Sequence, residues 1–214
     1  RAQKSVHVGV ATGRSLKQAT EMIAPIKLSG PSVFASGAQI IDARTGQIIE
    51  DYGLSRETYL QVLNITKKFG KILGAYVNGE KIPADEKSAD PTTVFITGLT
   101  PKEYEDIYRE VVLLPGIAVH KTTSWTKGCN DLHVSHEKAQ KDLALLKVAE
   151  ILNIKPEEMI GVGDGPNDTT FIKVCGLKVA LGNAVPELKA IANYIAPSFQ
   201  EDGVADVIEK FILE

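Results

Sequence analysis

The chain has 214 residues, of which 43% are hydrophobic and 24% are charged, and its net charge is −3. This length allows one large domain or two modest ones, each with its own hydrophobic core. The weakly negative charge excludes a global basic field of the kind that binds nucleic acid or an anionic membrane. No apolar run reaches the length that spans a bilayer. Cys129 and Cys175 form neither a CxxC nor a zinc pattern, which is typical of reduced thiols in a cytoplasmic protein.

The first part of the chain reads as an α/β unit. A strand is expected over residues 6–11, then a turn at Thr12-Gly13, a helix over 15–23 and a short strand over 32–35. Because the chain opens with Arg1 rather than Met and reaches a strand almost at once, we expect it to begin in the middle of a domain.

The last part repeats this alternation. A helix with Leu145, Val148, Ala149 and Leu152 on one face ends at Asn153. Strands are expected over 159–162, 177–181 and 194–195, with helices over 168–174, from Pro186, and over 204–212. Strands that alternate with helices indicate a parallel sheet covered by helices.

The middle of the chain has a different pattern. Strands over 38–42 and 47–51 flank a hairpin signal at 43–46, and helices are expected over 55–69 and from the capping box of Thr100, Pro101 and Glu103. Further strands are expected over 72–77, 93–96, 117–120 and 132–134. The sequence therefore predicts a core domain of residues 1–41 and 134–214, interrupted by an α+β insert of residues 42–133.

The strongest chemical signal is GDGPND at residues 163–168, directly after an apolar run. Ligands of open α/β sheets bind at the carboxyl ends of the strands, and Asp164 lies at such an end. Asp168 opens the next helix, so its carboxylate can turn back toward the same point. Hard oxygen donors without nearby His or Cys favour Mg²⁺. The alternative is a surface turn at Asp164 and a helix cap at Asp168.

A dinucleotide site is disfavoured at the same place. Gly161-Val162-Gly163 begins a GxGxxG pattern, but Pro166 breaks it. The acidic side chains that follow would also repel a pyrophosphate.

Two weaker signals lie outside this loop. Thr12-Gly13-Arg14 stands between a strand end and a helix start, where a hydroxyl, amide groups and the helix dipole can bind a phosphate; the alternative is a helix cap by Thr12 or Ser15. Lys141 lies on the helix before GDGPND and could neutralise a phosphate, or it could be a solvated helix lysine. Lys138, three residues earlier, competes for the same role.

Together these signals resemble the second, third and fourth motifs of haloacid dehalogenase (HAD) superfamily phosphatases, in order: Thr12-Gly13-Arg14, Lys141 with Ala144-Leu145, and GDGPND. The sequence is most similar to the Cof-like branch, which includes sugar-phosphate phosphatases and archaeal phosphoglycolate phosphatases. Its closing segments at 179–184, 187–189 and 202–204 also resemble that branch, and Ser36-Gly37-Ala38 stands where the branch usually has Asn-Gly-Ala.

The resemblance implies a Rossmann-like α/β core with three layers and a parallel sheet, carrying a mobile α+β cap. It implies a Mg²⁺-dependent phosphomonoesterase that works through an aspartyl-phosphate. By position, Thr12 and Lys141 are the catalytic groups, and Thr12, Gly13, Arg14, Lys141 and Asn167 bind the substrate. Asp164 and Asp168 are the metal ligands.

The family's first motif, DxDGT, has no match. The nearest string, residues 42–46 (DARTG), lies in the predicted hairpin turn and lacks the second Asp. Because this motif supplies the nucleophile on a central strand, we expect the 214 residues to be a shortened piece of a longer protein and to be inactive alone. The alternative is a natural, non-catalytic relative that binds a phosphorylated ligand or a partner.

The substrate is expected to be a small soluble phosphate ester, such as phosphoglycolate or a sugar phosphate. Trp125, Asn130 and His133 are candidate specificity residues in the insert, although each also has an ordinary packing explanation.

Overall fold

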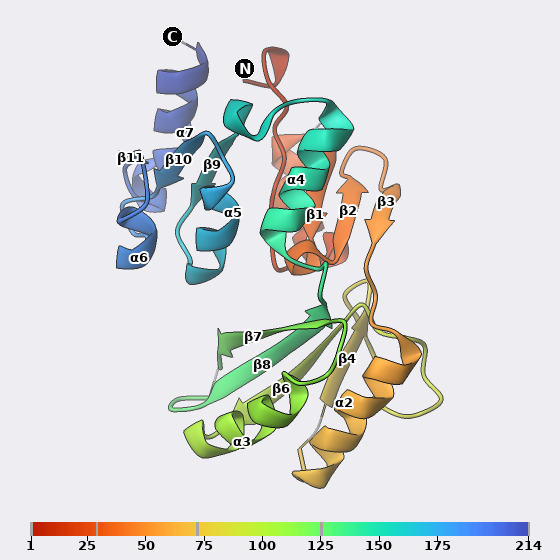
Figure 1. Cartoon of the computed structure of the whole chain (residues 1–214). Helices are drawn as coiled ribbons and strands as arrows, with labels where there is room; N and C mark the ends of the chain where they lie inside the picture. The colour runs from red at the N-terminus through yellow and green to blue at the C-terminus, as the bar shows by residue number, and fades with distance from the viewer. Residues whose placement is uncertain (1, 29, 72, 125, 214) are drawn as a thin grey trace.

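The computed structural model describes residues 2–28, 30–71, 73–124 and 126–213 (Figure 1). Two bodies lie one above the other in this view, and the chain crosses between them after β3 and again after β8. The upper body contains both termini. None of the helices in the described ranges is long and apolar enough to cross a bilayer.

The N-terminal elements form an antiparallel sheet beside one helix. The elements are α1 (Leu16–Ile23), β1 (Pro31–Phe34), β2 (Gln39–Asp42) and β3 (Ile48–Asp51), and the strands pair in the order β1-β2-β3. The predicted hairpin at 43–46 is confirmed: Gly46, with φ +74°, donates from its backbone N–H to the Asp42 carbonyl at 2.8 Å. Since β2 pairs with β1, this hairpin extends the sheet of the upper body.

The strand predicted over residues 6–11 is wrong in all but its last residue. Only Ala11 forms a bridge, parallel to Val33 of β1. The Val33 amide donates to the Val10 carbonyl at 2.7 Å, and the Thr12 amide donates to the Val33 carbonyl at 2.9 Å. In the described ranges, these contacts supply a ladder on one side of the segment alone. Residues 6–11 therefore have the apolar pattern of a central strand, but among the described residues they lack a second neighbouring strand that would hold them in regular β conformation.

The C-terminal elements form the predicted parallel sheet. The strands are β9 (Ile160–Gly163), β10 (Leu177–Ala180) and β11 (Tyr194–Ile195), paired in the order β11-β10-β9. The helices are α4 (Lys141–Leu152), α5 (Thr169–Lys173), α6 (Pro186–Lys189) and α7 (Gly203–Ile208). Asn153 ends α4 in the left-handed conformation with φ +53°, as predicted. Within the part of the chain that the structure describes, β9 pairs with β10 and no ladder joins it to β1.

The lower body is a five-stranded sheet with two helices on one face. Its strands are β4 (Leu73–Val77), β5 (Glu80–Ile82), β6 (Thr93–Leu99), β7 (Ile117–Thr123) and β8 (Asn130–His136), in the order β5-β4-β6-β8-β7. Its helices are α2 (Arg56–Lys68) and α3 (Pro101–Val111). Thr100 and Glu103 form the predicted capping box at the start of α3. In Figure 1 both helices lie on the side of the sheet away from the upper body, so the other face of the sheet is turned toward it.

Strand β5 is not among the strands predicted from the sequence. Asn78 and Gly79 link β4 to β5 with φ values of +50° and +83°. An Asn-Gly pair between two strands is a strong signal for this two-residue hairpin. The signal was present in the sequence, but the polar residues of β5 hid the strand that follows it.

The domain boundaries at 41/42 and 133/134 remain predictions. Asp42 is the last residue of β2, and β8 continues past the second boundary to His136.

Candidate functional site

The centre of the site is an ion pair between α4 and the loop that follows β9. Lys141, the first residue of α4, is 6% exposed, and its Nζ lies 2.8 Å from Asp168 Oδ1. The same Nζ lies 5.5 Å from the centre of the Phe171 ring. A lysine is rarely buried unless it is paired, and this pair meets that condition.

The second oxygen of Asp168 organises the GDGPND loop. Asp168 Oδ2 accepts hydrogen bonds from the backbone N–H groups of Asp164 at 3.1 Å and Gly165 at 3.0 Å. A Cβ added at Gly163 would lie 2.7 Å from Asp168 Cβ, so a glycine is needed for the side chain to reach back. The carboxylate thus turns toward Asp164 as the sequence predicted, and its two oxygens connect α4 to the loop.

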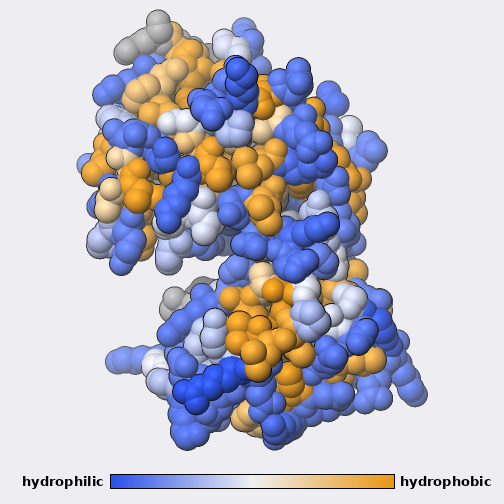
Figure 2. Space-filling view, viewed as in Figure 1, coloured by the Kyte–Doolittle hydropathy of each residue, from blue (hydrophilic) through white to orange (hydrophobic). Residues whose placement is uncertain are grey.

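Asp164 is exposed at the carboxyl end of β9. Its Oδ2 accepts a hydrogen bond from Asn183 Nδ2 at 2.8 Å. Asn167 is also exposed, and its Oδ1 would lie 2.7 Å from a Cβ added at Gly165, which places the amide over that glycine. Figure 2 shows a hollow between the two bodies, on the left of the view, and the carboxyl end of β9 points toward it in Figure 1.

The Thr12-Gly13-Arg14 turn is closed by its own hydroxyl. Thr12 Oγ1 accepts a hydrogen bond from the Arg14 backbone N–H at 3.1 Å. Ser15, not Thr12, is the N-cap of α1: it receives a hydrogen bond from the Gln18 amide, and the Gln18 side chain bonds the Ser15 amide in return. Thr12, Gly13 and Arg14 therefore lie just outside the helix that Ser15 caps, and Gly13 and Arg14 are exposed.

A chain of close contacts connects this turn to Lys141. A Cβ added at Gly13 would lie 3.2 Å from Ser36 Oγ. Gly37, with φ +106°, is packed so tightly that an added Cβ would lie 2.4 Å from the backbone carbonyl carbon of Gln140, the residue before Lys141. Residues 36–38 thus join the 12–14 turn to the start of α4. The structure brings the three predicted motifs to one end of that helix.

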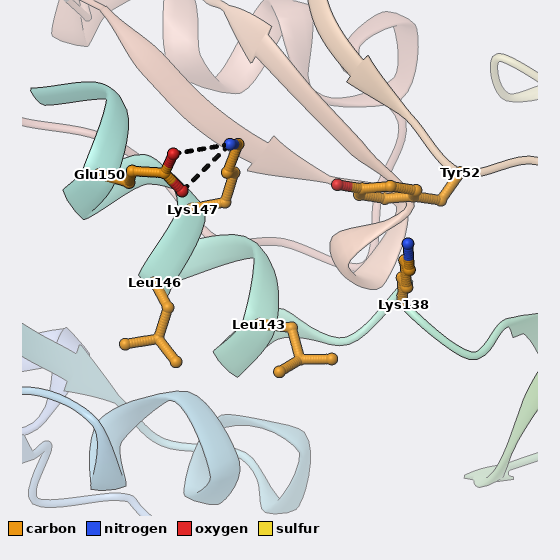
Figure 3. Close-up of a pocket in the computed structure, with 6 residues that line it drawn as sticks. All are labelled: Tyr52, Lys138, Leu143, Leu146, Lys147 and Glu150. Atoms are coloured by element: carbon orange, nitrogen blue, oxygen red, sulfur yellow. Dashed lines mark hydrogen bonds and ion pairs between the residues drawn. The ribbon is translucent and has the colours of Figure 1, made fainter.

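Lys138 occupies a different place. It is exposed and lines a separate pocket along α4, together with Tyr52 and Lys147 (Figure 3). Lys147 there pairs with Glu150 at 3.0 Å. Of the two lysines that the sequence left open, Lys141 is the one that contacts the GDGPND loop.

The donor set fits part of a magnesium site. Asp164 offers an exposed carboxylate at a strand end, whereas both oxygens of Asp168 already accept hydrogen bonds. The described residues contain no group of three or more His, Cys, Asp or Glu side chains placed to hold a metal ion. Mg²⁺ commonly takes one or two carboxylates and completes its shell with water and phosphate oxygens. These residues suit that ion and leave most of its shell to other ligands.

The face of the five-stranded sheet opposite its helices carries a row of rings. Gly74, Phe95, His133 and His120 are direct cross-strand neighbours on β4, β6, β8 and β7. The His133 ring stacks on Phe95 with centroids 4.5 Å apart, and the Tyr76 ring covers Gly74 and meets Phe95 edge-on.

His133, one of the predicted specificity residues, is 4% exposed in this row. Burial lowers the pKa of His133 to about 3, with a smaller contribution from His120. The Nε2 atoms of both histidines are buried without a hydrogen-bond partner. Asn130 begins β8, and Trp125 lies outside the described residues. Phe95 and His120 were not predicted from the sequence, although the alternation of side chains along β6 and β7 places both on this face.

Comparison with known proteins matches the chain to the haloacid dehalogenase-like hydrolase family over residues 1–94 and 76–208. The chain is 28% identical, over 211 residues, to the 5-amino-6-(5-phospho-D-ribitylamino)uracil phosphatase YcsE of Bacillus subtilis, covering 98% of the chain and 84% of that relative. It is 32% identical over 121 residues to a phosphoglycolate phosphatase of Methanobrevibacter smithii, covering 56% of the chain and 49% of the relative.

The fold agrees with this match. A haloacid dehalogenase-like hydrolase from Bacteroides thetaiotaomicron superposes with a TM-score of 0.83 at 21% identity, covering 98% of the chain and 88% of the relative. The family and fold class predicted from the sequence are thereby confirmed. The chain belongs to the haloacid dehalogenase-like hydrolase family.

Proposed function

We propose that this haloacid dehalogenase-like phosphatase hydrolyses a small phosphomonoester in a Mg²⁺-dependent reaction at the end of α4. The observation that carries the proposal is the buried Lys141–Asp168 pair, which lies beside Asp164 and is joined through residues 36–38 to the Thr12 turn. A cation, a carboxylate and a hydroxyl-bearing turn at one end of α4 are the groups that phosphoryl transfer needs for positioning and charge neutralisation.

Each side chain has a distinct task in this scheme. Lys141 attracts the phosphoryl oxygens, and Asp168 holds the ammonium group in place because it accepts a hydrogen bond from it at 2.8 Å. Thr12, Gly13, Arg14 and Asn167 bind the phosphoryl group. Asp164, supported by Asn183, would anchor the metal ion, and Asp168, whose oxygens accept hydrogen bonds from Lys141 and the loop amides, would position the metal or its waters. When bound, Mg²⁺ would neutralise charge that develops on the transferred group.

The nucleophile is proposed to come from outside these 214 residues, as an aspartate on a further strand. The split between the two sheets of the upper body supports this. In the described ranges β9 has a ladder partner on one side only, and residues 6–10 make no strand. A parallel strand between them would supply both missing ladders and carry its last residues to the same edge as Asp164.

The substrate class is proposed from the relatives. Those described above are named as phosphatases of 5-amino-6-(5-phospho-D-ribitylamino)uracil and of phosphoglycolate. We propose phosphoglycolate or a sugar phosphate as the substrate here. A reducing cytoplasm is the proposed location, because Cys129 and Cys175 are both free thiols.

A second candidate is a non-catalytic member of the family that binds a phosphorylated ligand or a partner. It is supported by the absence of a DxDGT motif from the sequence.

The two candidates are separated by a comparison of two proteins. One is the 214-residue chain, and the other is the same chain extended by the residues encoded upstream of Arg1. Both are assayed with Mg²⁺ and a panel of phosphate esters, with release of inorganic phosphate as the readout. The phosphatase predicts turnover by the extended protein and none by the 214 residues. An upstream start codon near Arg1, or an inactive extended protein that still binds phosphate, would favour the binder. Turnover by the 214 residues would overturn the assignment of the nucleophile.

A further inference from the structure

The Asn78-Gly79 turn between β4 and β5 reaches from the five-stranded sheet to the N-terminal elements of the upper body. Asn78 Oδ1 accepts a hydrogen bond from Gln39 Nε2 at 2.5 Å. Glu80, two residues after Asn78, forms an ion pair with Lys17 of α1 at 2.5 Å.

Gly79 makes the tightest of these contacts. A Cβ added there would lie 1.8 Å from Ser15 Oγ and 2.4 Å from Ser15 Cβ, distances that real Cβ atoms do not show. Ser15 is 3% exposed. The backbone of the turn therefore lies directly on the Ser15 side chain, and only a glycine leaves room for that approach.

The contacts differ in what they contribute. Lys17 and Glu80 are more than half exposed, with side-chain exposures of 69% and 64%, so this ion pair adds little. Gln39 is 1% exposed and also donates to Asp51 Oδ2 at 3.0 Å. Loss of the Asn78 partner would leave part of a buried amide unsatisfied, which is costly. The specific part of the contact is therefore Gly79 on Ser15 and Asn78 on Gln39.

Ser15 connects this contact to the phosphate-binding turn. It caps α1 through the Gln18 amide, and it directly follows Arg14, whose amide donates to Thr12 Oγ1. A displacement of Ser15 would therefore move the adjacent Arg14 amide, which donates to the Thr12 hydroxyl.

We propose that the Asn78-Gly79 turn is a positioning element: by packing on Ser15 it holds residues 12–15 in the geometry that binds the phosphoryl group. Gly79 is the positioning residue, and it touches no substrate. This inference rests on the proposed function for its role in phosphate binding, but the contact itself is independent of catalysis.

The test compares two glycine variants with similar backbone strain. Gly79→Ala introduces the clash at φ +83°, whereas Gly116→Ala places a Cβ at φ +74° with nothing within 4 Å. The first readout is hydrogen exchange of the Gln18 amide, which the Ser15 cap protects. We expect exchange about tenfold faster or more in Gly79→Ala and little change in Gly116→Ala.

A double variant guards against general misfolding. Ser15→Gly removes the atoms that the new methyl group would meet, and glycine is tolerated at an N-cap. Without the Ser15 side chain, the nearest remaining atom to a Cβ at Gly79 is Gln18 Cδ at 3.8 Å. Because Ser15→Gly alone also removes the hydroxyl that protects Gln18, rescue is scored on the second readout, the affinity for inorganic phosphate measured by ³¹P NMR. Gly79→Ala should lower this affinity about tenfold, and Ser15→Gly/Gly79→Ala should regain the affinity of Ser15→Gly alone.

The outcomes separate the two proposals. Equal Gln18 exchange in the two alanine variants would overturn the positioning role, whatever the phosphate data show. Faster exchange in Gly79→Ala with unchanged phosphate affinity would overturn it too, because the turn would then stabilise α1 without positioning the site. If the wild-type protein extended by the residues encoded upstream of Arg1 bound no phosphate, the proposed function would fail, and so would the role of the turn in phosphate binding. The Gln18 exchange would still show whether Gly79 holds Ser15 in place.

Discussion

Lys141 and Asp168, 27 residues apart in the chain, form an ion pair of 2.8 Å in which the side chains are only 6% and 13% exposed. Removal of one partner from a buried pair leaves the other charge unsatisfied. We expect Lys141→Met to lower the free energy of unfolding by about 3–5 kcal/mol, measured by urea denaturation.

Lys138→Met is the matched control for this pair, because Lys138 is exposed. Lys138→Met should change the free energy of unfolding by no more than about 0.5 kcal/mol. Equal losses in the two variants would contradict the structural role of the pair.

Asp164 is exposed, and its proposed task is to bind a metal ion rather than to stabilise the fold. Asp164→Asn should therefore change the free energy of unfolding by about 0.5 kcal/mol or less. It should weaken Mg²⁺ binding by at least about tenfold, a loss typical even of residues that only support a ligand. Calorimetric titration with Mg²⁺ measures the affinity. Asp90→Asn, at an exposed carboxylate of the lower body, should leave the Mg²⁺ affinity unchanged.

Gly37 packs against the backbone just before Lys141, and any side chain there would displace the start of α4. We expect Gly37→Ala to destabilise the protein by about 2 kcal/mol or more beyond the cost of its positive φ. Gly46→Ala provides the comparison, since it has φ +74° and nothing within 4 Å of an added Cβ. Thermal or urea unfolding that ranked the two variants equally would argue against the close approach.

The buried histidines predict a loss of stability in mild acid. Burial lowers the pKa of both His133 and His120 in the folded state, so below pH 6.5 the unfolded chain takes up protons that the folded chain does not. Stability should therefore fall as the pH drops from about 6.5 toward 5.

His133 contributes at most about 1.4 kcal/mol per pH unit to the slope of the free energy of unfolding against pH. In His133→Gln the slope between pH 5 and 6.5 should be shallower by up to that amount, whatever the variant's stability at neutral pH. Urea denaturation at several pH values measures it, and an unchanged slope would show that burial does not shift the pKa of His133 in the folded protein.

Local signals were enough to predict most elements from the sequence. The capping box of α3, the stop at Asn153 and the hairpin at 43–46 depend on residues a few positions apart. The strand predicted over 6–11 failed because a strand needs partners, and in the described ranges this segment pairs with β1 alone, at one residue.

The site divides in the same way. Spacing along the chain left the GDGPND loop, the Thr12 turn and a lysine between them as separate weak signals, and their order, which resembles the family's motifs, selected them together. It could not choose between Lys138 and Lys141, or between Thr12 and Ser15 as the cap of α1. The cap of α1 is set locally, by the hydrogen bonds between Ser15 and Gln18. Only the tertiary structure decided the choice of lysine, since it depends on Asp168 and Gly37 approaching Lys141 and Gln140 from distant parts of the chain. The physical reason is that burial and pairing of a side chain are set by long-range packing, which the order of neighbouring residues does not encode locally.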